Sequence, residues 1–139
     1  MSFLKMLLPI FLLVTFTGCS NTYSIESLKV DLEEKGYIVS SYETEEFFIP
    51  TKTKRLKVNE ETLYIYMFRS KLKMETAASQ IDPNGAHYTS GSKVKSVSWV
   101  KPPSFYKRGR IIVQYFGEDE KVISDLTDIL GEQFAGVKK

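Results

Sequence analysis

The sequence has 139 residues, of which 19 are lysine or arginine and 17 are aspartate or glutamate, so its formal net charge is only +2. This near balance argues against a nucleic-acid-binding protein, whose phosphate contacts normally require a large basic excess. A single cysteine cannot form a disulfide within the chain, and an aromatic content of 13% favours strands and a well-filled core.

The first eighteen residues have the layout of a secretory signal peptide. Lys5 supplies a positive charge, an apolar run extends over Met6–Phe16, and a threonine and a glycine follow it. A membrane-spanning helix needs about 20 apolar residues, whereas this run is shorter and contains Pro9. The sequence therefore predicts that Met1–Gly18 is a signal peptide and is removed from the mature chain.

The last four residues around the predicted cleavage point, Phe16-Thr17-Gly18-Cys19, resemble the bacterial lipobox, in which an apolar residue and two small residues precede an obligatory cysteine. The resemblance implies that a diacylglyceryl group is attached to the sulfur of Cys19, that cleavage occurs before it, and that the new amino group is open to acylation, for example with palmitate. Two acyl chains give stable membrane attachment, whereas one chain gives only marginal binding. The alternative interpretation is an incidental cysteine behind an ordinary signal peptide.

The mature chain is expected to contain a short tether, one folded domain and a tail. The lipidated cysteine and the tether occupy residues 19–23, a single domain occupies residues 24–136, and the tail occupies residues 137–139. The four tether residues after the cysteine span at most about 14 Å when extended. We therefore expect the domain to lie close to the membrane surface.

Three segments have the apolar periodicity of amphipathic helices. They are residues 24–35, residues 70–81, and a segment that begins at residue 118 or 119 and ends near residues 133–136. Ser24 and Ser70 are suitable N-terminal caps for the first two helices. The third segment has the clearest apolar stripe in the chain.

Other segments are rich in strand-forming residues. They are residues 37–42, 47–49, 55–59, 62–68, 97–101, 105–107 and 110–116. Turn residues at Glu60-Glu61 and at Arg108-Gly109 predict two hairpins, and the polar residues 87–95 are expected to form a loop. This order of elements predicts an α+β fold, with a mainly antiparallel sheet of about four to six strands and three helices packed on it.

No motif in the chain supplies a catalytic set or a cofactor site. His87 is the only histidine and lies in the polar segment that is expected to be an exposed loop. The Asp82-Pro83-Asn84-Gly85 turn resembles the start of a calcium loop, but Ala86 and Lys93 occupy positions where such a loop requires ligands. We therefore expect no catalytic, cofactor-binding or metal-binding residues.

Basic and aromatic residues alternate around the second predicted hairpin, at Trp99, Lys101, Phe105, Tyr106, Lys107, Arg108 and Arg110. One interpretation is an interaction patch that meets an anionic partner such as lipid headgroups. The other interpretation, which the pattern favours, is a hairpin tip whose aromatic side chains turn into the core.

Five stretches of the sequence resemble a group of small, uncharacterised lipoproteins of bacilli and other bacteria. They are Val58–Tyr66, Ile81–Gly85, Trp99–Tyr106, Arg108–Tyr115 and Leu130–Gly136. The likeness covers most of residues 58–136 and comes with the same lipobox start. It implies no activity, and no site residue other than Cys19.

These features together predict a membrane-anchored extracytoplasmic lipoprotein on the outer face of the cell membrane of a Gram-positive bacterium. We expect a non-enzymatic binding or accessory module of the cell envelope. Its expected partners are the membrane, through the lipid on Cys19, and an envelope protein, a glycan or anionic lipid headgroups. The alternatives are a cell-envelope hydrolase whose site forms only in the fold, and a purely structural or assembly role.

Overall fold

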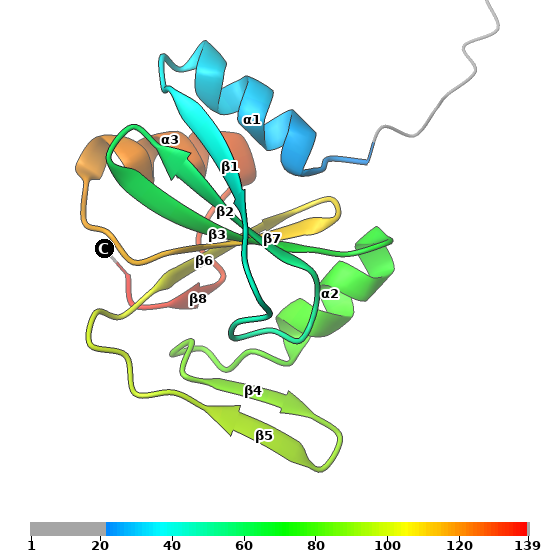
Figure 1. The fold of residues 1–139 in the computed structure, drawn as a ribbon. Coiled ribbons are helices and arrows are strands. Elements are labelled where there is room, and N and C mark those ends of the chain that lie inside the picture. The colour runs from blue at the N-terminus through cyan, green and yellow to red at the C-terminus, as the bar shows by residue number, and fades with distance from the viewer. Residues whose placement is uncertain (1–21, 139) are drawn as a thin grey trace, which may run out of the picture.

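The computed structural model describes residues 22–138, which form three helices and eight strands (Figure 1). The helices are α1 (Ile25–Glu34), α2 (Lys71–Ser79) and α3 (Glu120–Leu130). The strands are β1 (Val39–Glu43), β2 (Thr53–Val58), β3 (Glu61–Met67), β4 (His87–Ser90), β5 (Lys93–Ser96), β6 (Ser104–Arg108), β7 (Ile111–Tyr115) and β8 (Ala135–Gly136). The predicted single α+β domain is confirmed. Among the described residues, no helix is long and apolar enough to cross a bilayer.

Six strands form one antiparallel sheet in the order β1-β2-β3-β7-β6-β8. The central strand β7 is buried along its whole length. Both predicted hairpins, β2–β3 and β6–β7, are present, and their turns contain Asn59 at a φ of 54° and Gly109 at a φ of 58°. Asparagine and glycine adopt such positive φ values more readily than other residues. The first turn lies at Asn59-Glu60, one residue before the predicted Glu60-Glu61, and the second contains the predicted Gly109.

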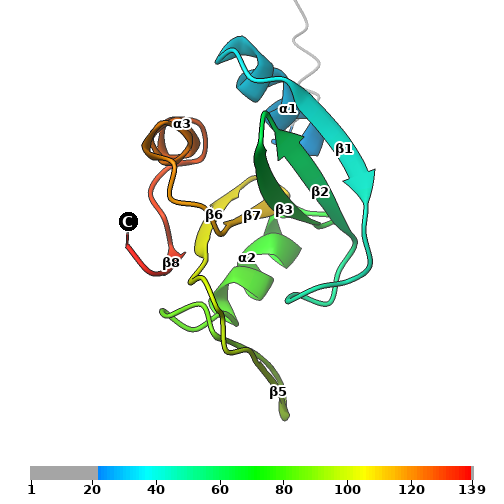
Figure 2. The same cartoon turned by 60° about the vertical axis from the view of Figure 1, so that its left-hand side comes forward.

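Two helices cover one face of the sheet, and one helix covers part of the other face (Figures 1 and 2). In the first core, Leu28 of α1 and Leu126 of α3 belong to the same cluster as Ile65. In the second core, Met74 of α2 belongs to the same cluster as Tyr66. Successive strand residues point to opposite faces, so Ile65 and Tyr66 serve different cores. Full burial of such a side chain contributes about 1.5–3 kcal/mol to folding.

The second face of the sheet is covered only in part. α2 packs over the middle of the sheet, where Tyr66 and Ile112 are buried. Side chains on the same face of β1 and β2, such as Tyr42 and Arg55, are exposed. A face of an antiparallel sheet that no helix covers remains open to solvent.

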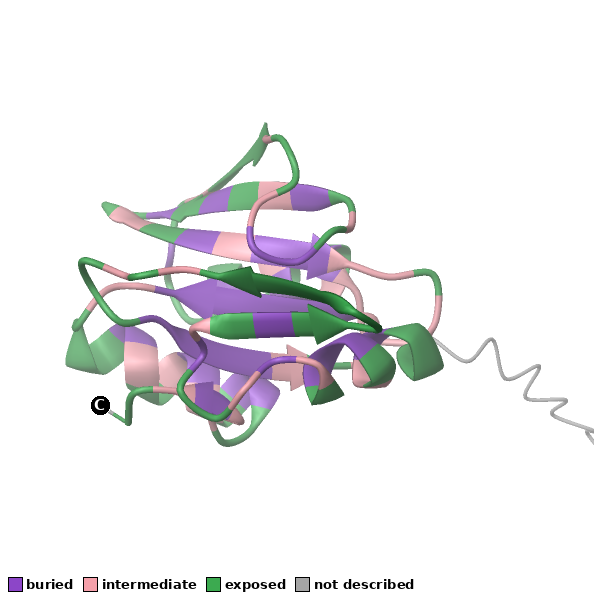
Figure 3. Ribbon diagram, turned by 90° about the horizontal axis from the view of Figure 1, so that it is seen from below, coloured by how far each residue is buried: buried purple, intermediate pink, exposed green. Residues whose placement is uncertain are grey.

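The segment between α2 and β6 differs from the prediction. Residues 87–95, expected to be a loop, form most of the separate β4–β5 hairpin, which turns at Gly91 and is almost fully exposed in the foreground of Figure 3. Residues 97–101, expected to be a strand, form none. The indole N–H of Trp99 donates a 2.7 Å hydrogen bond to the carbonyl of Gly85, and this bond holds the segment against the second core instead of in a ladder.

Two further predictions are wrong, one of a whole strand and one of a helix end. The strand expected at residues 47–49 is absent, because Phe48 and Ile49 are buried in the second core from a loop. The last helix ends at Leu130 and not near residues 133–136, because Gly131 adopts a φ of 92°. The chain then turns back and adds the two-residue strand β8 beside β6.

Candidate ligand-binding surface

The aromatic residues of the predicted interaction patch lie largely in the interior. Phe105 and Tyr106 are 0% and 1% exposed. They are neighbours on β6 and point to opposite faces, so Phe105 belongs to the second core and Tyr106 to the first. Trp99 is half-buried against the second core. The fold therefore does not gather these rings on one surface.

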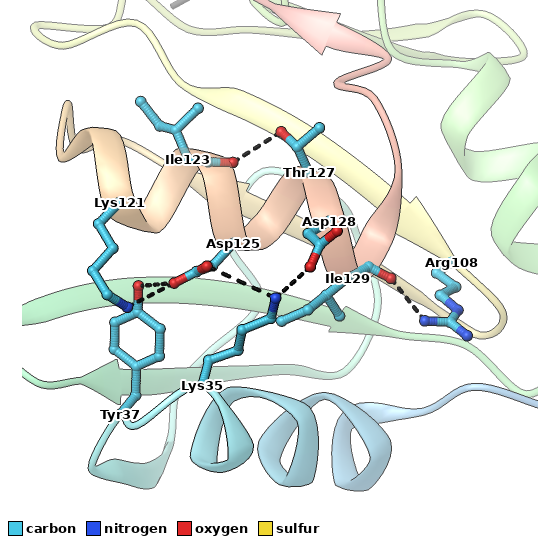
Figure 4. Close-up of polar contacts among 9 residues, drawn as sticks. All are labelled: Lys35, Tyr37, Arg108, Lys121, Ile123, Asp125, Thr127, Asp128 and Ile129. Carbon is cyan, nitrogen blue, oxygen red and sulfur yellow. Dashed lines mark hydrogen bonds and ion pairs between the residues drawn. The ribbon is translucent and has the colours of Figure 1, made fainter.

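Two basic residues of the predicted patch are engaged by the protein itself. Lys107 forms an ion pair with Glu75 of α2 at 2.6 Å. Arg108 lies 4.0 Å from the ring centre of Tyr23, and its guanidinium group donates a 2.7 Å hydrogen bond to the carbonyl of Ile129 (Figure 4). These contacts attach the β6–β7 hairpin to α2 and α3.

The other two basic residues lie apart from each other. Lys101 is exposed in the loop before β6, whereas Arg110 follows the hairpin turn and lines a pocket beside the start of α1. The seven residues of the predicted patch therefore do not form one surface. The three aromatic residues lie in or against the two cores, Lys107 and Arg108 contact other parts of the protein, Lys101 lies in an exposed loop, and Arg110 lines a pocket.

The uncovered half of the sheet presents a contiguous polar and aromatic surface, which we call the open face. It consists of Tyr42 on β1, Arg55 and Lys57 on β2, and Thr62 and Tyr64 on β3. Tyr42 and Tyr64 both lie opposite Arg55 in adjacent strands, and such cross-strand side chains are about 5 Å apart. Four of these residues line a shallow depression of about 240 Å³.

The open face carries two cations that have no ion-pair partner among residues 22–138. Arg55 and Lys57 are exposed and, two residues apart on β2, point to the same side. Lys54, which points to the other side, pairs instead with Glu43 at 3.4 Å. No carboxylate lines the depression. This surface therefore attracts anions.

Three half-buried rings border the open face beyond Tyr64, and we call them the aromatic wall: Phe47, Trp99 and Phe116. Phe47 stacks on Tyr64 with ring centres 4.8 Å apart and planes at 28°. Phe116 contacts Tyr64 and Trp99 edge-on at 5.8 and 5.2 Å. Ring pairs of this kind contribute about 0.5–1.5 kcal/mol each beyond their buried area, so the wall is a rigid border.

A buried hydrogen-bond network lies next to the wall. The hydroxyl of Tyr66 donates to the Oε1 atom of Gln114 and accepts a 3.3 Å hydrogen bond from the backbone N–H of Phe48. Burial raises the pKa of Tyr66, which keeps its hydroxyl group protonated and able to donate. The network fixes the backbone beside Phe47 and thereby helps to place the aromatic wall.

The most extensive charged cluster joins α3 to the segment after α1 (Figure 4). Tyr37 and Lys121 donate hydrogen bonds of 2.6 and 2.8 Å to Oδ2 of Asp125, and Lys35 pairs with Asp128. Burial acts to raise the pKa of Asp125, but the hydrogen bonds from Lys121 and Tyr37 lower it below its usual range. The lowered pKa keeps Asp125 ionised, so it accepts these hydrogen bonds and joins α3 to the segment after α1.

The residues considered for catalysis and metal binding have structural surroundings. His87 is exposed, and its Nδ1 atom lies 2.7 Å from the hydroxyl of Ser96 across the β4–β5 hairpin. Oδ1 of Asp82 accepts hydrogen bonds from the backbone N–H groups of Ala86 and His87 at 2.8 and 2.9 Å, as in a side-chain-stabilised turn. Within residues 22–138, no group of three or more His, Cys, Asp and Glu side chains could hold a metal ion. Cys19 lies outside the described residues.

Compared with models of known protein families, with curated proteins and with solved structures, the chain gives no match. The open face escaped the sequence-based prediction, although its alternation Arg55-Leu56-Lys57 was recognised as a strand. The sequence does not show that α2, the helix on this face of the sheet, covers part of β3 and β7 but leaves most of β1 and β2 uncovered.

Proposed function

We propose that this chain is a membrane-anchored extracytoplasmic lipoprotein that acts as a non-enzymatic binding module, and that its open face binds an anionic glycan of the cell envelope. The observation that carries the proposal is the pair of unpaired cations, Arg55 and Lys57, beside the exposed ring of Tyr42 on the uncovered sheet.

The chemistry of the open face suits a charged sugar polymer. The guanidinium group of Arg55 can bind a carboxylate or phosphate through two hydrogen bonds, and Lys57 adds a second positive charge. Tyr42 offers a ring on which the apolar face of a sugar packs, and Thr62 offers a hydroxyl group. The depression is shallow, whereas a small-molecule site usually encloses most of its ligand. A polymer that crosses the surface fits this shape better than an enclosed small molecule.

The N-terminal sequence supports the anchored location. The signal-peptide layout, the lipobox resemblance at Cys19 and the likeness to small lipoproteins of bacilli all favour attachment to the outer face of the cell membrane in a Gram-positive organism. A domain on a tether of about 14 Å would meet the envelope polymers nearest the membrane.

Glycan binding can be tested with the native lipoprotein in maltoside micelles. The only tryptophan of the chain, Trp99, lies in the aromatic wall, so its fluorescence reports on this surface. We expect phosphorylated dextran, an anionic glycan, to change the fluorescence and neutral dextran to leave it unchanged. Replacement of both cations, Arg55→Gln with Lys57→Gln, should weaken binding about tenfold, which corresponds to about 1.4 kcal/mol.

The matched control removes the same charge from two exposed lysines elsewhere, Lys93→Gln with Lys101→Gln. This variant should bind the glycan like the native protein. An equal loss of affinity in both double variants would mean that net charge alone attracts the polymer. No binding by the native protein would reject the anionic glycan as the ligand.

A further inference from the structure

A second cationic site lies at the end of the domain where the described chain begins. A pocket of about 510 Å³ forms there among the start of α1 with the residues before it, the start of α2 with the residues before it, and the residue that precedes β7. Figure 1 shows these segments at the same end of the domain. The pocket's lining residues are Thr22, Ser24, Ser27, Arg69, Ser70, Lys71 and Arg110. We call it the basic pocket, because every charged residue that lines it is positive.

The three cations of the basic pocket have no counter-charge. Arg69, Lys71 and Arg110 form no ion pair with any of residues 22–138. By contrast, Lys107 and Lys121 each pair with a carboxylate. Like charges gathered around one cavity repel each other, and an anion in the cavity would remove that repulsion.

Arg110 is held in place by its backbone on both sides. Its N–H group donates a 2.8 Å hydrogen bond to the carbonyl of Tyr23, and its carbonyl accepts a 2.9 Å hydrogen bond from the N–H of Phe68. The Nε atom of its guanidinium group is buried and has no acceptor among the described residues. Buried N–H groups are nearly always hydrogen-bonded, so this one indicates a missing acceptor.

The start of α2 adds a second, independent argument. Ser70 caps this helix by accepting a 3.1 Å hydrogen bond from the N–H of Lys73. Negative charge is favoured at a helix N-terminus, yet Arg69 and Lys71 flank this cap and the first turn contains no acidic residue. The positive charges of Arg69 and Lys71 are repelled by the positive end of the α2 dipole, and a bound anion would offset this repulsion.

We infer that the basic pocket binds a phosphate group, and specifically the phosphate of an anionic phospholipid in the membrane that carries the anchor. The choice of lipid rests on the proposed anchoring at Cys19. Thr22, which lines the pocket, follows Cys19 by three residues, a distance of at most about 11 Å. The headgroup layer is about 5–7 Å thick on each side of a bilayer, so the pocket lies within reach of lipid phosphates. The hydroxyl groups of Ser24, Ser27 and Ser70 supply further donors.

The inference can be tested by the rate at which Lys71 reacts with an amine-directed reagent, read by mass spectrometry of the native lipoprotein. In maltoside micelles, added phosphatidylglycerol should slow the labelling of Lys71 about tenfold relative to that of Lys93. The carboxylate amphiphile oleate, which adds negative charge without phosphate, should not. Inorganic phosphate should protect Lys71 only at concentrations at least about tenfold higher than the lipid.

Two variants keep the test decisive. Arg110→Gln should abolish the protection, and Arg69→Gln should reduce it at an exposed position whose replacement leaves the fold intact, as circular dichroism would verify. Protection by inorganic phosphate at or below the lipid concentration would overturn the assignment to lipid. Protection by neither probe, or equal protection by oleate, would overturn the phosphate site.

Failure of this inference is distinguishable from failure of the proposed function. Glycan binding at the open face is read from Trp99 in the same preparation, and the pocket variants should leave it unchanged. A chain without lipid on Cys19 would remove the anchor, whereas the phosphate probe would still report on the pocket.

Discussion

At the scale of single residues, Tyr66 shows how one buried hydroxyl group supports a surface that lies above it. Its bonds to Gln114 and to the backbone of Phe48 are the polar contacts next to the aromatic wall. With phenylalanine at position 66, the Oε1 atom of Gln114 and the backbone N–H of Phe48 would stay buried and lose these hydrogen bonds.

We therefore expect Tyr66→Phe to lower the free energy of unfolding by about 1–3 kcal/mol, measured by urea denaturation. Tyr42→Phe is the matched control, because Tyr42 is 47% exposed. Its effect should stay within about 0.5 kcal/mol. Equal effects of the two substitutions would show that the buried network does not support the fold.

Burial also makes the stability of the domain depend on pH in alkaline solution. Burial is the largest cause that raises the pKa values of Tyr23, Tyr66 and Tyr115 above the ordinary value of 10.0. These residues ionise near pH 10 in the unfolded chain but not in the folded chain, so their stabilisation is complete below pH 10 and is lost as the pH rises further.

For Tyr66 the loss should reach about 1.4 kcal/mol at pH 11. Urea denaturation at pH 9 and pH 11 measures it. The stability difference between the native protein and Tyr66→Phe should shrink by about 1.4 kcal/mol over this range. A difference that is independent of pH would mean that Tyr66 ionises equally in both states.

At the scale of elements, the β6–β7 hairpin holds the first described residues against the domain. Gly109 at its turn adopts a φ of 58°, and a Cβ atom there would lie 2.3 Å from the carbonyl oxygen of Tyr23. Gly91 in the β4–β5 turn has a similar φ of 60°, but a Cβ atom there would meet nothing within 4 Å.

Alanine at these two glycines therefore separates backbone strain from steric overlap. Both substitutions should incur about 1–2 kcal/mol of strain from the positive φ. Gly109→Ala should lose a further 1–3 kcal/mol or so because the chain at Tyr23 must move away. Thermal denaturation of both variants measures the difference, and equal melting temperatures would show that Tyr23 does not pack on the turn.

At the start of α2, Lys71 is expected to lower the stability of the free protein while it contributes to phosphate binding. Lys71→Glu places a negative charge where the helix favours it and removes one repelling cation. In phosphate-free buffer this substitution should raise the free energy of unfolding by about 0.3–1 kcal/mol. The same variant should lose the stabilisation that phosphatidylglycerol gives to the native protein. A lower stability in phosphate-free buffer would contradict the presence of an unsatisfied basic cluster.

The sequence predicted the elements that have a clear apolar pattern, whereas the polar β4–β5 hairpin was expected to be a loop. Apolar periodicity located all three helices, and Gly109 located the β6–β7 hairpin. The β2–β3 hairpin was predicted with its turn at Glu60-Glu61, whereas the turn lies at Asn59-Glu60. Elements that depend on distant partners were missed, such as β8, which exists only because β6 lies beside it. The segment around Trp99 failed for the same reason, since its conformation follows from a bond to Gly85.

The candidate sites were even less accessible from the sequence. Arg110 was included in a predicted patch, but its pocket partners lie elsewhere in the chain: Arg69 and Lys71 flank the cap of α2, and Ser24 caps α1. Sequence neighbours on a strand point to opposite faces, so the run Phe105-Tyr106-Lys107 could not form one surface. Arg110 is far from Arg69 and Lys71 in the sequence, and only the folded structure shows that all three line one pocket.

At the scale of the whole molecule, a nearly neutral chain carries two separate cationic surfaces. The open face lies on β1, β2 and β3, and the basic pocket lies where α1 and α2 begin. We propose that the first binds a glycan of the envelope and the second binds the membrane from which the domain is tethered. In both proposals the domain lies at the membrane surface, which requires the proposed lipid anchor at Cys19.

The intact mass of the protein extracted from cell membranes tests this anchor most directly. We predict the mass of residues 19–139 plus a diacylglyceryl group, with or without one further acyl chain, and the loss of this species in Cys19→Ala. An unmodified chain, or membrane retention of Cys19→Ala without any lipid, would contradict it.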